Sequence, residues 1–224
     1  MLQAVFFDFD GTISDTVSQL REAINMTMQK HGYPERTQDE VLSFINNGAR
    51  ELVRRAMPEY LQSDEALVDH VLADYQEAYS KVYLKTERTY EGVDRLIAQL
   101  HAQGLRIAVL SNKPDRYMLP LCEQVLEPGS FDVAQGALPQ MPTKPHPYLS
   151  ELVAKKLGVA LDACVMVGDS DVDLATANNA GVPCISVLWG FRTRQELEEA
   201  GATIFCETPA DLKELVDRLA ASLS

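Results

Sequence analysis

The apolar residues of this chain gather in short runs, each about the length of one β-strand. Such runs occur at residues 5–7, 107–110, 163–167, 183–188 and 203–205. They lack the alternation of apolar and polar residues that marks a strand with one wet face. Each is therefore expected to be buried on both faces, as the strands of parallel sheets are.

Helical patterns separate most of these runs. Apolar residues recur with a period of 3.6 over residues 93–100, 149–157 and 212–219, and the segment between Asp169 and Gly181 is also expected to be helical. Strands that alternate with helices form parallel sheets with right-handed crossovers. The pattern therefore predicts an α/β fold.

The stretch between the first two predicted strands breaks this alternation. Residues 15–84 carry only helical pattern, including an amphipathic segment over 17–28 and a long one over 67–82. This stretch is too long for a simple crossover between two strands. We therefore predict an inserted all-helical domain at residues 15–84, while residues 1–14 and 85–224 form the α/β core.

Two carboxylates follow the first strand. Asp8 and Asp10 are two residues apart, so the strand period places both on one side of the backbone at the strand's carboxyl end. Ligands of open α/β sheets bind outside these ends, where a cation or a shared proton must neutralise the paired acids. Taken alone, the segment is equally compatible with a turn whose acids are solvated.

Other strand ends add to this pair. Ser111 follows the second predicted strand and Asp169 follows the third, which places both at the same edge of the sheet. Carboxylates and a hydroxyl suit Mg²⁺, which takes oxygen ligands and keeps several waters for a phosphorylated substrate. The four histidines are scattered without metal-ligand spacing, which argues against zinc. Neither a glycine-rich dinucleotide motif nor a P-loop follows a strand.

Charge and composition narrow the partners and the compartment. The formal net charge of −13 at pH 7 makes nucleic acid and anionic membranes poor partners. The chain has no apolar run long enough to span a membrane and no N-terminal targeting pattern. The four cysteines form no C-x-x-C pair. We therefore expect a cytoplasmic protein that binds neither membranes nor nucleic acid.

The order of these residues resembles that of the haloacid dehalogenase superfamily of phosphohydrolases, over essentially the whole chain. Residues 8–12 (DFDGT) resemble its first motif, Ser111 its second, Lys144 its third and residues 168–173 (GDSDVD) its fourth. The resemblance implies a Rossmann-like core with a mobile helical cap formed by the insertion.

The resemblance also implies a chemistry. Asp8 would be the nucleophile that forms an aspartyl-phosphate, and Asp10 would serve as general acid and then general base. Asp8, the backbone carbonyl of Asp10, and Asp169 would hold Mg²⁺. Ser111 and Lys144 would bind the oxygens of the transferring phosphoryl group.

Three further residues take supporting roles in this scheme. Asp173 would either contact the metal's ligands or hold Lys144 in place. Thr12 and Asn112 are expected to contact the substrate beside the first and second motifs.

Within the superfamily, the chain most resembles phosphoglycolate phosphatase-like enzymes. Residues 46–50 (NNGAR) and 187–192 (VLWGFR) carry this resemblance, although Asn46 replaces the first glycine of the family's usual Gly-Asn-Gly. We expect a small phosphorylated metabolite as substrate and a monomeric or homodimeric enzyme. Arg50 is either a clamp for a second anionic group of the substrate or a solvated residue on a helix.

Several alternatives stay open on the same fold. A phosphosugar mutase, a pyrophosphatase and a nucleotide phosphatase use the same nucleophile. A receiver-type signalling domain is also phosphorylated on Asp, but it is far shorter and lacks a helical insertion. A binding module without catalysis would be expected to have lost a motif residue.

Overall fold

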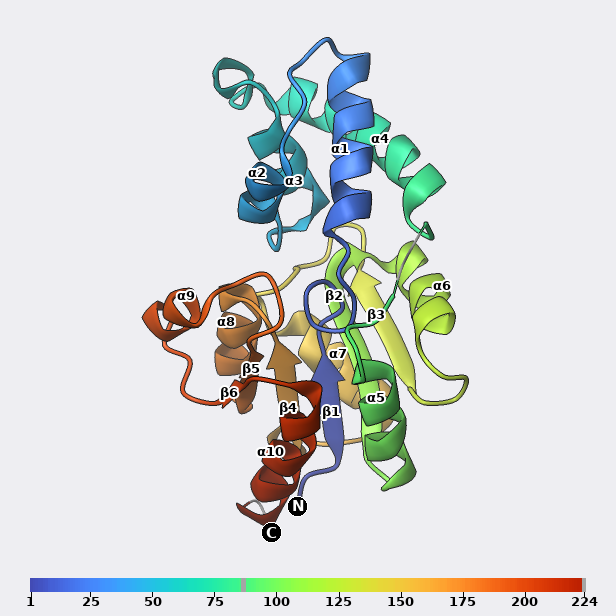
Figure 1. The fold of residues 1–224 in the computed structure, drawn as a ribbon, viewed down its shortest axis with the longest axis vertical. Helices are drawn as coiled ribbons and strands as arrows, with labels where there is room; N and C mark the ends of the chain where they lie inside the picture. Colours follow the sequence, from blue (N-terminus) through green and yellow to red (C-terminus); the bar gives the residue numbers. More distant parts are fainter. Residues whose placement is uncertain (86–87, 223–224) are drawn as a thin grey trace. The chain divides into compact units, whose positions relative to one another are not determined.

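The computed structural model describes residues 1–85 and 88–222 (Figure 1). The chain divides into two compact units, one of Met1–Asp15 with Arg88–Ser224 and one of Thr16–Glu87. The first unit contains the sheet, and each regular element described in the second is a helix. The roles of catalytic core and cap remain predictions for these units.

The six strands described in the first unit run parallel in one sheet, in the order β3-β2-β1-β4-β5-β6. Their bounds are β1 Ala4–Phe7, β2 Arg106–Pro114, β3 Val133–Ala137, β4 Cys164–Gly168, β5 Cys184–Val187 and β6 Phe205–Cys206. At the centre, Phe7 of β1 lies beside Val109 of β2 and Val167 of β4. The strand order reverses between β1 and β4, which is where sheets of this type bind ligands.

Helices cover both faces of this sheet (Figure 1). In this view α5 (Val93–Ala102) and α10 (Pro209–Ser222) lie in front of the sheet, and α7 (Tyr148–Leu157) lies behind it. The remaining helices are α6 (Asp115–Val125), α8 (Asp171–Ala180), α9 (Arg194–Glu199) and the short 3-10 helix η2 (Leu161–Ala163).

The central strand is buried on both of its faces. Phe6 and Phe7 point to opposite faces of the sheet, and neither is more than 1% exposed. Phe6 belongs to a core cluster that also contains Leu149 of α7 and Leu174 of α8. Burying one such side chain contributes roughly 1.5–3 kcal/mol. Packing therefore anchors the strand that leads into Asp8.

The second unit is built from α1 (Val17–Lys30), α2 (Gln38–Phe44), α3 (Gly48–Ala56), the 3-10 helix η1 (Glu59–Leu61) and α4 (Glu65–Val82). Helices α1 and α4 pack against each other. Ile24 and Met28 of α1 are buried, as are Val71 and Tyr75 of α4. These residues are the apolar stripe that the sequence shows on both helices, so this unit has a core of its own.

The predicted fold class, an α/β protein with a Rossmann-like parallel sheet, is confirmed. The apolar pattern does not predict β3, because Gln135 and Gly136 interrupt its short run at the edge of the sheet. It also does not predict α6, which contains Pro120, or the short α9. None of the described helices combines the length and the apolar character needed to cross a membrane.

Candidate active site

The carboxyl ends of the central strands bring the predicted site residues together. Asp8 follows β1, and its backbone N–H donates to the carbonyl of Val167 in β4 at 2.9 Å, so strand pairing extends to the acid itself. Ser111 lies near the end of β2, and Asp169 follows β4. Asp8, Ser111 and Asp169 are all buried.

Lys144 reaches this edge of the sheet from the segment between β3 and α7. Its Nζ lies 2.8 Å from Oδ1 of Asp8 and 2.7 Å from Oδ1 of Asp173. Burial alone would lower the pKa of Lys144, but the carboxylates of Asp173 and Asp8 outweigh it and raise that pKa. One buried ammonium group thus forms ion pairs with two buried carboxylates. The ion pair with Asp173 holds the Lys144 side chain in place.

Asp169 is held by groups from two other loops. The backbone N–H of Phe191 donates to Oδ2 of Asp169 at 2.7 Å, and the hydroxyl of Thr12 donates to Oδ1 at 3.4 Å. The indole N–H of Trp189 in turn donates to the carbonyl of Thr12 at 3.0 Å. The structure therefore directs the hydroxyl of Thr12 toward Asp169.

Two glycines leave space for the side chain of Asp169. Gly11 has a φ of +79°, and a Cβ there would lie 2.2 Å from Oδ2 of Asp169. A Cβ at Gly190 would lie 2.3 Å from the Cβ of Asp169. Only glycine combines the positive φ with such a close approach at position 11, which gives the glycine of the DFDGT segment a physical reason.

Negative charge exceeds positive charge in this buried cluster. Carboxylate oxygens of Asp8, Asp169 and Asp173 lie within 4.8 Å of one another. Burial, and then the Asp173 carboxylate, raises the pKa of Asp8 well above its usual range, and Lys144 offsets only part of this. The same two causes raise the pKa of Asp169 to about 7. A set of oxygen ligands with uncompensated negative charge fits a hard divalent cation such as Mg²⁺.

Asp10 has a buried partner that sequence reasoning missed. The Nζ of Lys113 lies 2.8 Å from Oδ1 of Asp10, and the lysine side chain is only 4% exposed. Lys113 stands two residues after Ser111, so the period of the strand predicts that both side chains lie on the same side of β2. This spacing is the signal that could have identified Lys113.

Ser111 and Asn112 are engaged with backbone groups at the site. The hydroxyl of Ser111 accepts the N–H of Lys113 at 3.1 Å. The side-chain amide of Asn112 donates to the carbonyl of Lys144 at 2.9 Å and accepts the Lys144 N–H at 2.8 Å. This pair of hydrogen bonds ties the Lys144 backbone to β2, so Asn112 positions Lys144.

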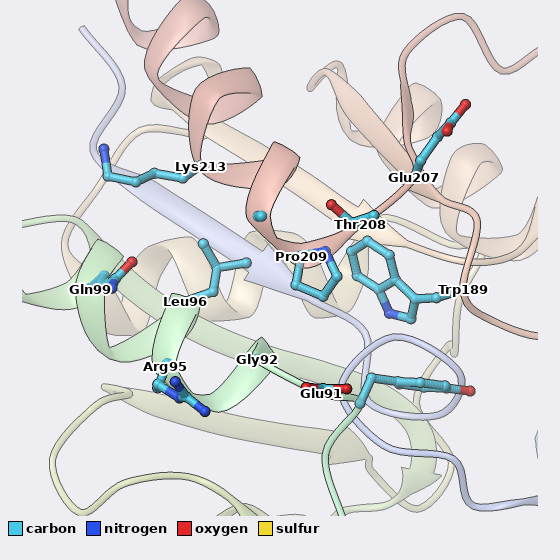
Figure 2. A pocket seen from close by; sticks show the side chains of 12 residues that line it. Glu91, Gly92, Arg95, Leu96, Gln99, Trp189, Glu207, Thr208, Pro209 and Lys213 are labelled. Carbon is cyan, nitrogen blue, oxygen red and sulfur yellow. The ribbon is translucent and has the colours of Figure 1, made fainter.

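A separate groove of about 810 Å³ opens beside α5 and the first turn of α10. Figure 2 shows Leu96, Trp189 and Pro209 along it. None of the predicted site residues lines this groove. The groove is connected to the site through Trp189, which lines the groove and donates a hydrogen bond to the carbonyl of Thr12.

Arg50, the remaining predicted residue, lies in the helical unit. From α3 its guanidinium binds Asp69 at 2.9 Å and Glu65 at 2.7 Å, both on α4. Asn46, which replaces a family glycine, has a φ of +87°. Asn is one of the few residues besides glycine that adopts this conformation readily, so it is a suitable replacement for glycine here.

Comparisons with known proteins identify the family of this chain. The sequence profile of haloacid dehalogenase-like hydrolases matches residues 5–187. Phosphoglycolate phosphatase 1 of Pseudomonas aeruginosa is 32% identical over 221 residues, which cover 96% of this chain and 80% of the relative. The phosphoglycolate phosphatase of Yersinia pseudotuberculosis serotype I is 33% identical over 194 residues, with coverage of 85% and 82%.

Solved structures show the same relationship. A protein of Lactobacillus delbrueckii subsp. bulgaricus, assigned as a phosphoglycolate phosphatase, has a TM-score of 0.89 and 32% identity, covering 96% of this chain and 98% of its own. A Haemophilus somnus protein has a TM-score of 0.86 at 23% identity, with coverage of 96% and 98%, and supports the fold alone. The predicted resemblance is confirmed, and the chain belongs to the family of haloacid dehalogenase-like hydrolases.

Proposed function

We propose that this protein is a Mg²⁺-dependent phosphatase that hydrolyses a small phosphoglycolate-like phosphomonoester through an aspartyl-phosphate. The observation that carries the proposal is the cluster of three buried carboxylates, Asp8, Asp169 and Asp173, two of which are in ion-pair contact with Lys144. An arrangement this costly in free energy is typical of a site that binds a cation and does chemistry. The names of the relatives support the phosphoglycolate-like substrate.

Asp8 is the nucleophile in this proposal. Its carboxylate oxygen attacks phosphorus, the bond from phosphorus to the leaving oxygen breaks, and an aspartyl-phosphate forms. Lys144 contacts the same carboxylate at 2.8 Å and stabilises charge on the phosphoryl oxygens, while the hydroxyl of Ser111 donates to one of them.

Asp10 moves the protons. It protonates the leaving oxygen in the first step, and in the second step it takes a proton from the water that attacks phosphorus. That attack releases inorganic phosphate and regenerates Asp8. Lys113 orients the Asp10 carboxylate from 2.8 Å away.

Asp8, Asp169 and the backbone carbonyl of Asp10 are the proposed ligands of Mg²⁺. When bound, the cation neutralises charge on the carboxylates and on the substrate's phosphoryl oxygens. Thr12 and Phe191 orient Asp169 toward this task through their hydrogen bonds. Asp173 holds Lys144, and Asn112 fixes the Lys144 backbone.

In this proposal the helical unit is the cap, and it recognises the part of the substrate beyond the phosphate. Arg50 is its candidate contact for a second anionic group, such as the carboxylate of phosphoglycolate. Because Arg50 already binds Glu65 and Asp69, a substrate anion would take the place of one of these carboxylates.

The direct test measures phosphate release from phosphoglycolate, pyrophosphate, a nucleoside monophosphate, a hexose phosphate and an aryl phosphate, each with Mg²⁺. We expect phosphoglycolate to have the largest kcat/KM, with Asp8→Asn inactive on all five. A preference for pyrophosphate or the nucleotide would replace the substrate class, and isomerisation of the hexose phosphate would indicate a mutase. The absence of hydrolysis on the whole panel would refute the proposed activity.

Cytoplasmic location, a monomeric or homodimeric state, and the lack of nucleic-acid and membrane partners remain predictions. The net charge of −13 supports the last of these, because anionic surfaces repel one another.

A further inference from the structure

The fold of the helical unit brings together two histidines that stand far apart in the sequence. Nε2 of His31 lies 2.8 Å from Oδ2 of Asp74, and Nε2 of His70 lies 4.0 Å from the same oxygen. The ligand atoms of all three side chains lie within 4.8 Å of one another. The spacing of the histidines in the sequence does not reveal this cluster, because His31 lies at the end of α1 and His70 lies within α4.

Two packed helices position the three side chains. His31 caps the C-terminus of α1, while His70 and Asp74 stand four residues apart on one side of α4. The ring of His31 stacks on Tyr33 and meets the ring of His70 edge-on, each with centroids 5.6 Å apart. The packing of α1 on α4 therefore holds the two imidazoles next to one carboxylate.

The neighbouring groups act in opposite directions on a cation at this point. Lys30 binds Oδ1 of Asp74 at 2.8 Å, and its positive charge offsets part of the carboxylate's charge, but it leaves Oδ2 toward the imidazoles. The C-terminal end of α1 adds the negative end of a helix dipole beside His31.

We propose that His31, His70 and Asp74 form a binding site for a divalent transition metal ion of the zinc class. Two imidazole nitrogens and one carboxylate oxygen are zinc ligands, and water would complete the coordination. Ligand atoms around a tetrahedral zinc ion stand about 3.3 Å apart, given its bond lengths of about 2.0–2.1 Å. The observed 2.8 and 4.0 Å lie on either side of that value.

The exposure of the three side chains shows how the site would form. His31 and Asp74 are largely covered, with 14% and 15% of their side chains exposed, so they make a fixed pair. His70 is 68% exposed, and its side chain would turn toward the pair when the ion binds. The metal ion would link the C-terminal end of α1 to α4.

A simple ion pair between His31 and Asp74 makes a different prediction about His70. In that case His70 has no role, and its replacement changes neither metal affinity nor stability. If the three residues bind a metal ion, His70→Gln leaves the metal-free protein unchanged but weakens metal binding.

The experiment titrates the full chain with Zn²⁺ against a chromogenic chelator, and with Co²⁺ while the visible absorption of bound cobalt is recorded. Excess Mg²⁺ competes with zinc for the carboxylate cluster of the other unit, and zinc that binds there contributes equally to wild type and variant. The matched control is His101→Gln, because His101 lies 3.4 Å from Asp132 in the first unit and, among the described residues, belongs to no cluster that could hold a metal.

We expect His70→Gln to weaken zinc binding at least tenfold and to reduce the cobalt absorption, while His101→Gln changes neither. Zinc should raise the Tm of the wild type and not that of His70→Gln, because a ligand stabilises the state that binds it. Equal zinc affinity in wild type and His70→Gln, or an equal loss in His101→Gln, would overturn the proposal. A lack of stoichiometric zinc binding by the wild type would overturn it as well.

Discussion

Each of the two units contains a cluster of ion pairs. The N–O distances in the two clusters are nearly the same, but one cluster is buried and the other is exposed to solvent. In the first unit, Lys144 lies 2.8 and 2.7 Å from Asp8 and Asp173, and all three side chains are at most 7% exposed. In the helical unit, Arg50 lies 2.7 and 2.9 Å from Glu65 and Asp69, with 40–64% of each side chain exposed. Distance alone therefore says little about what a charge pair does.

Burial decides the energetic consequence. Taking charges out of water costs several kcal/mol for each ion, so a buried cluster persists only while its charges compensate one another. In the exposed cluster, hydrogen bonds from Arg54 and Arg50 lower the pKa of Glu65 to about 2, yet water and salt screen the interaction. The buried cluster should therefore control catalysis and stability, while the exposed one tunes recognition.

The largest effect is expected from Asp8→Asn. The amide has nearly the shape of the carboxylate but is a poor nucleophile, so turnover should fall below a few per cent of wild type. Stability should stay the same or rise, because one of several crowded negative charges is removed. Phosphate-release assays and urea unfolding test both halves, and substantial residual turnover would rule out Asp8 as the nucleophile.

Removal of Mg²⁺ with a chelator should abolish activity, and Ca²⁺ should inhibit it. Ca²⁺ prefers more ligands at longer distances, which would engage both oxygens of Asp8 and spoil its approach to phosphorus. Mg²⁺ should also raise Tm, since it relieves the carboxylate repulsion in the folded state. Full turnover in excess chelator would contradict the proposed metal role.

Lys144→Ala should lower both kcat and stability. The loss of one partner from a buried pair costs about 3–5 kcal/mol, because the remaining carboxylates are left uncompensated. Addition of Asp8→Asn to the variant should recover part of that stability, since fewer charges then need a partner. An effect confined to KM would instead mark Lys144 as a contact that binds substrate and transition state equally.

The pH dependence of the free energy of unfolding should reveal the raised pKa of Asp169. Its folded pKa is about 7, while an unfolded aspartate titrates near 3.9. Between these values the folded state binds more protons than the unfolded state, so this group makes stability fall as pH rises from about 4 to 7. Urea unfolding in chelator should show that Asp169→Asn removes this part of the fall. Identical slopes for wild type and variant would contradict the raised pKa.

The motif positions are readable from the sequence because local patterns determine them. An unbroken apolar run predicts a buried strand, and Asp8 and Asp169 follow such runs directly. The edge strand β3 escapes this reasoning, because its polar Gln135 and Gly136 break the run and only pairing with β2 makes it a strand. The other edge strand, β6, is signalled by the short run at residues 203–205, so a missed strand reflects a broken apolar run and not its place at the edge.

Contacts between segments that are distant in the sequence could not be predicted for a different reason. The ion pair of Lys113 with Asp10 and the hydrogen bond from Phe191 to Asp169 depend on how loops from different strands meet. The meeting of His31 with His70 depends on the packing of two helices. Sequence spacing names candidate residue types, but tertiary packing decides which of them become partners.

The smallest effect is expected in the exposed cluster, from Arg50→Ala. Its ion pairs are screened by solvent, so Tm should change little. If Arg50 contacts the substrate's second anionic group, kcat/KM for phosphoglycolate should fall about tenfold, or 1.4 kcal/mol, while an aryl phosphate is spared. The matched control is Arg55→Ala on the same helix, because Arg55 is 37% exposed and pairs with Glu51 at 2.8 Å. Equal losses on phosphoglycolate, pyrophosphate and the aryl phosphate would show that Arg50 serves folding or closure, and the exposed cluster would then lose its role in recognition.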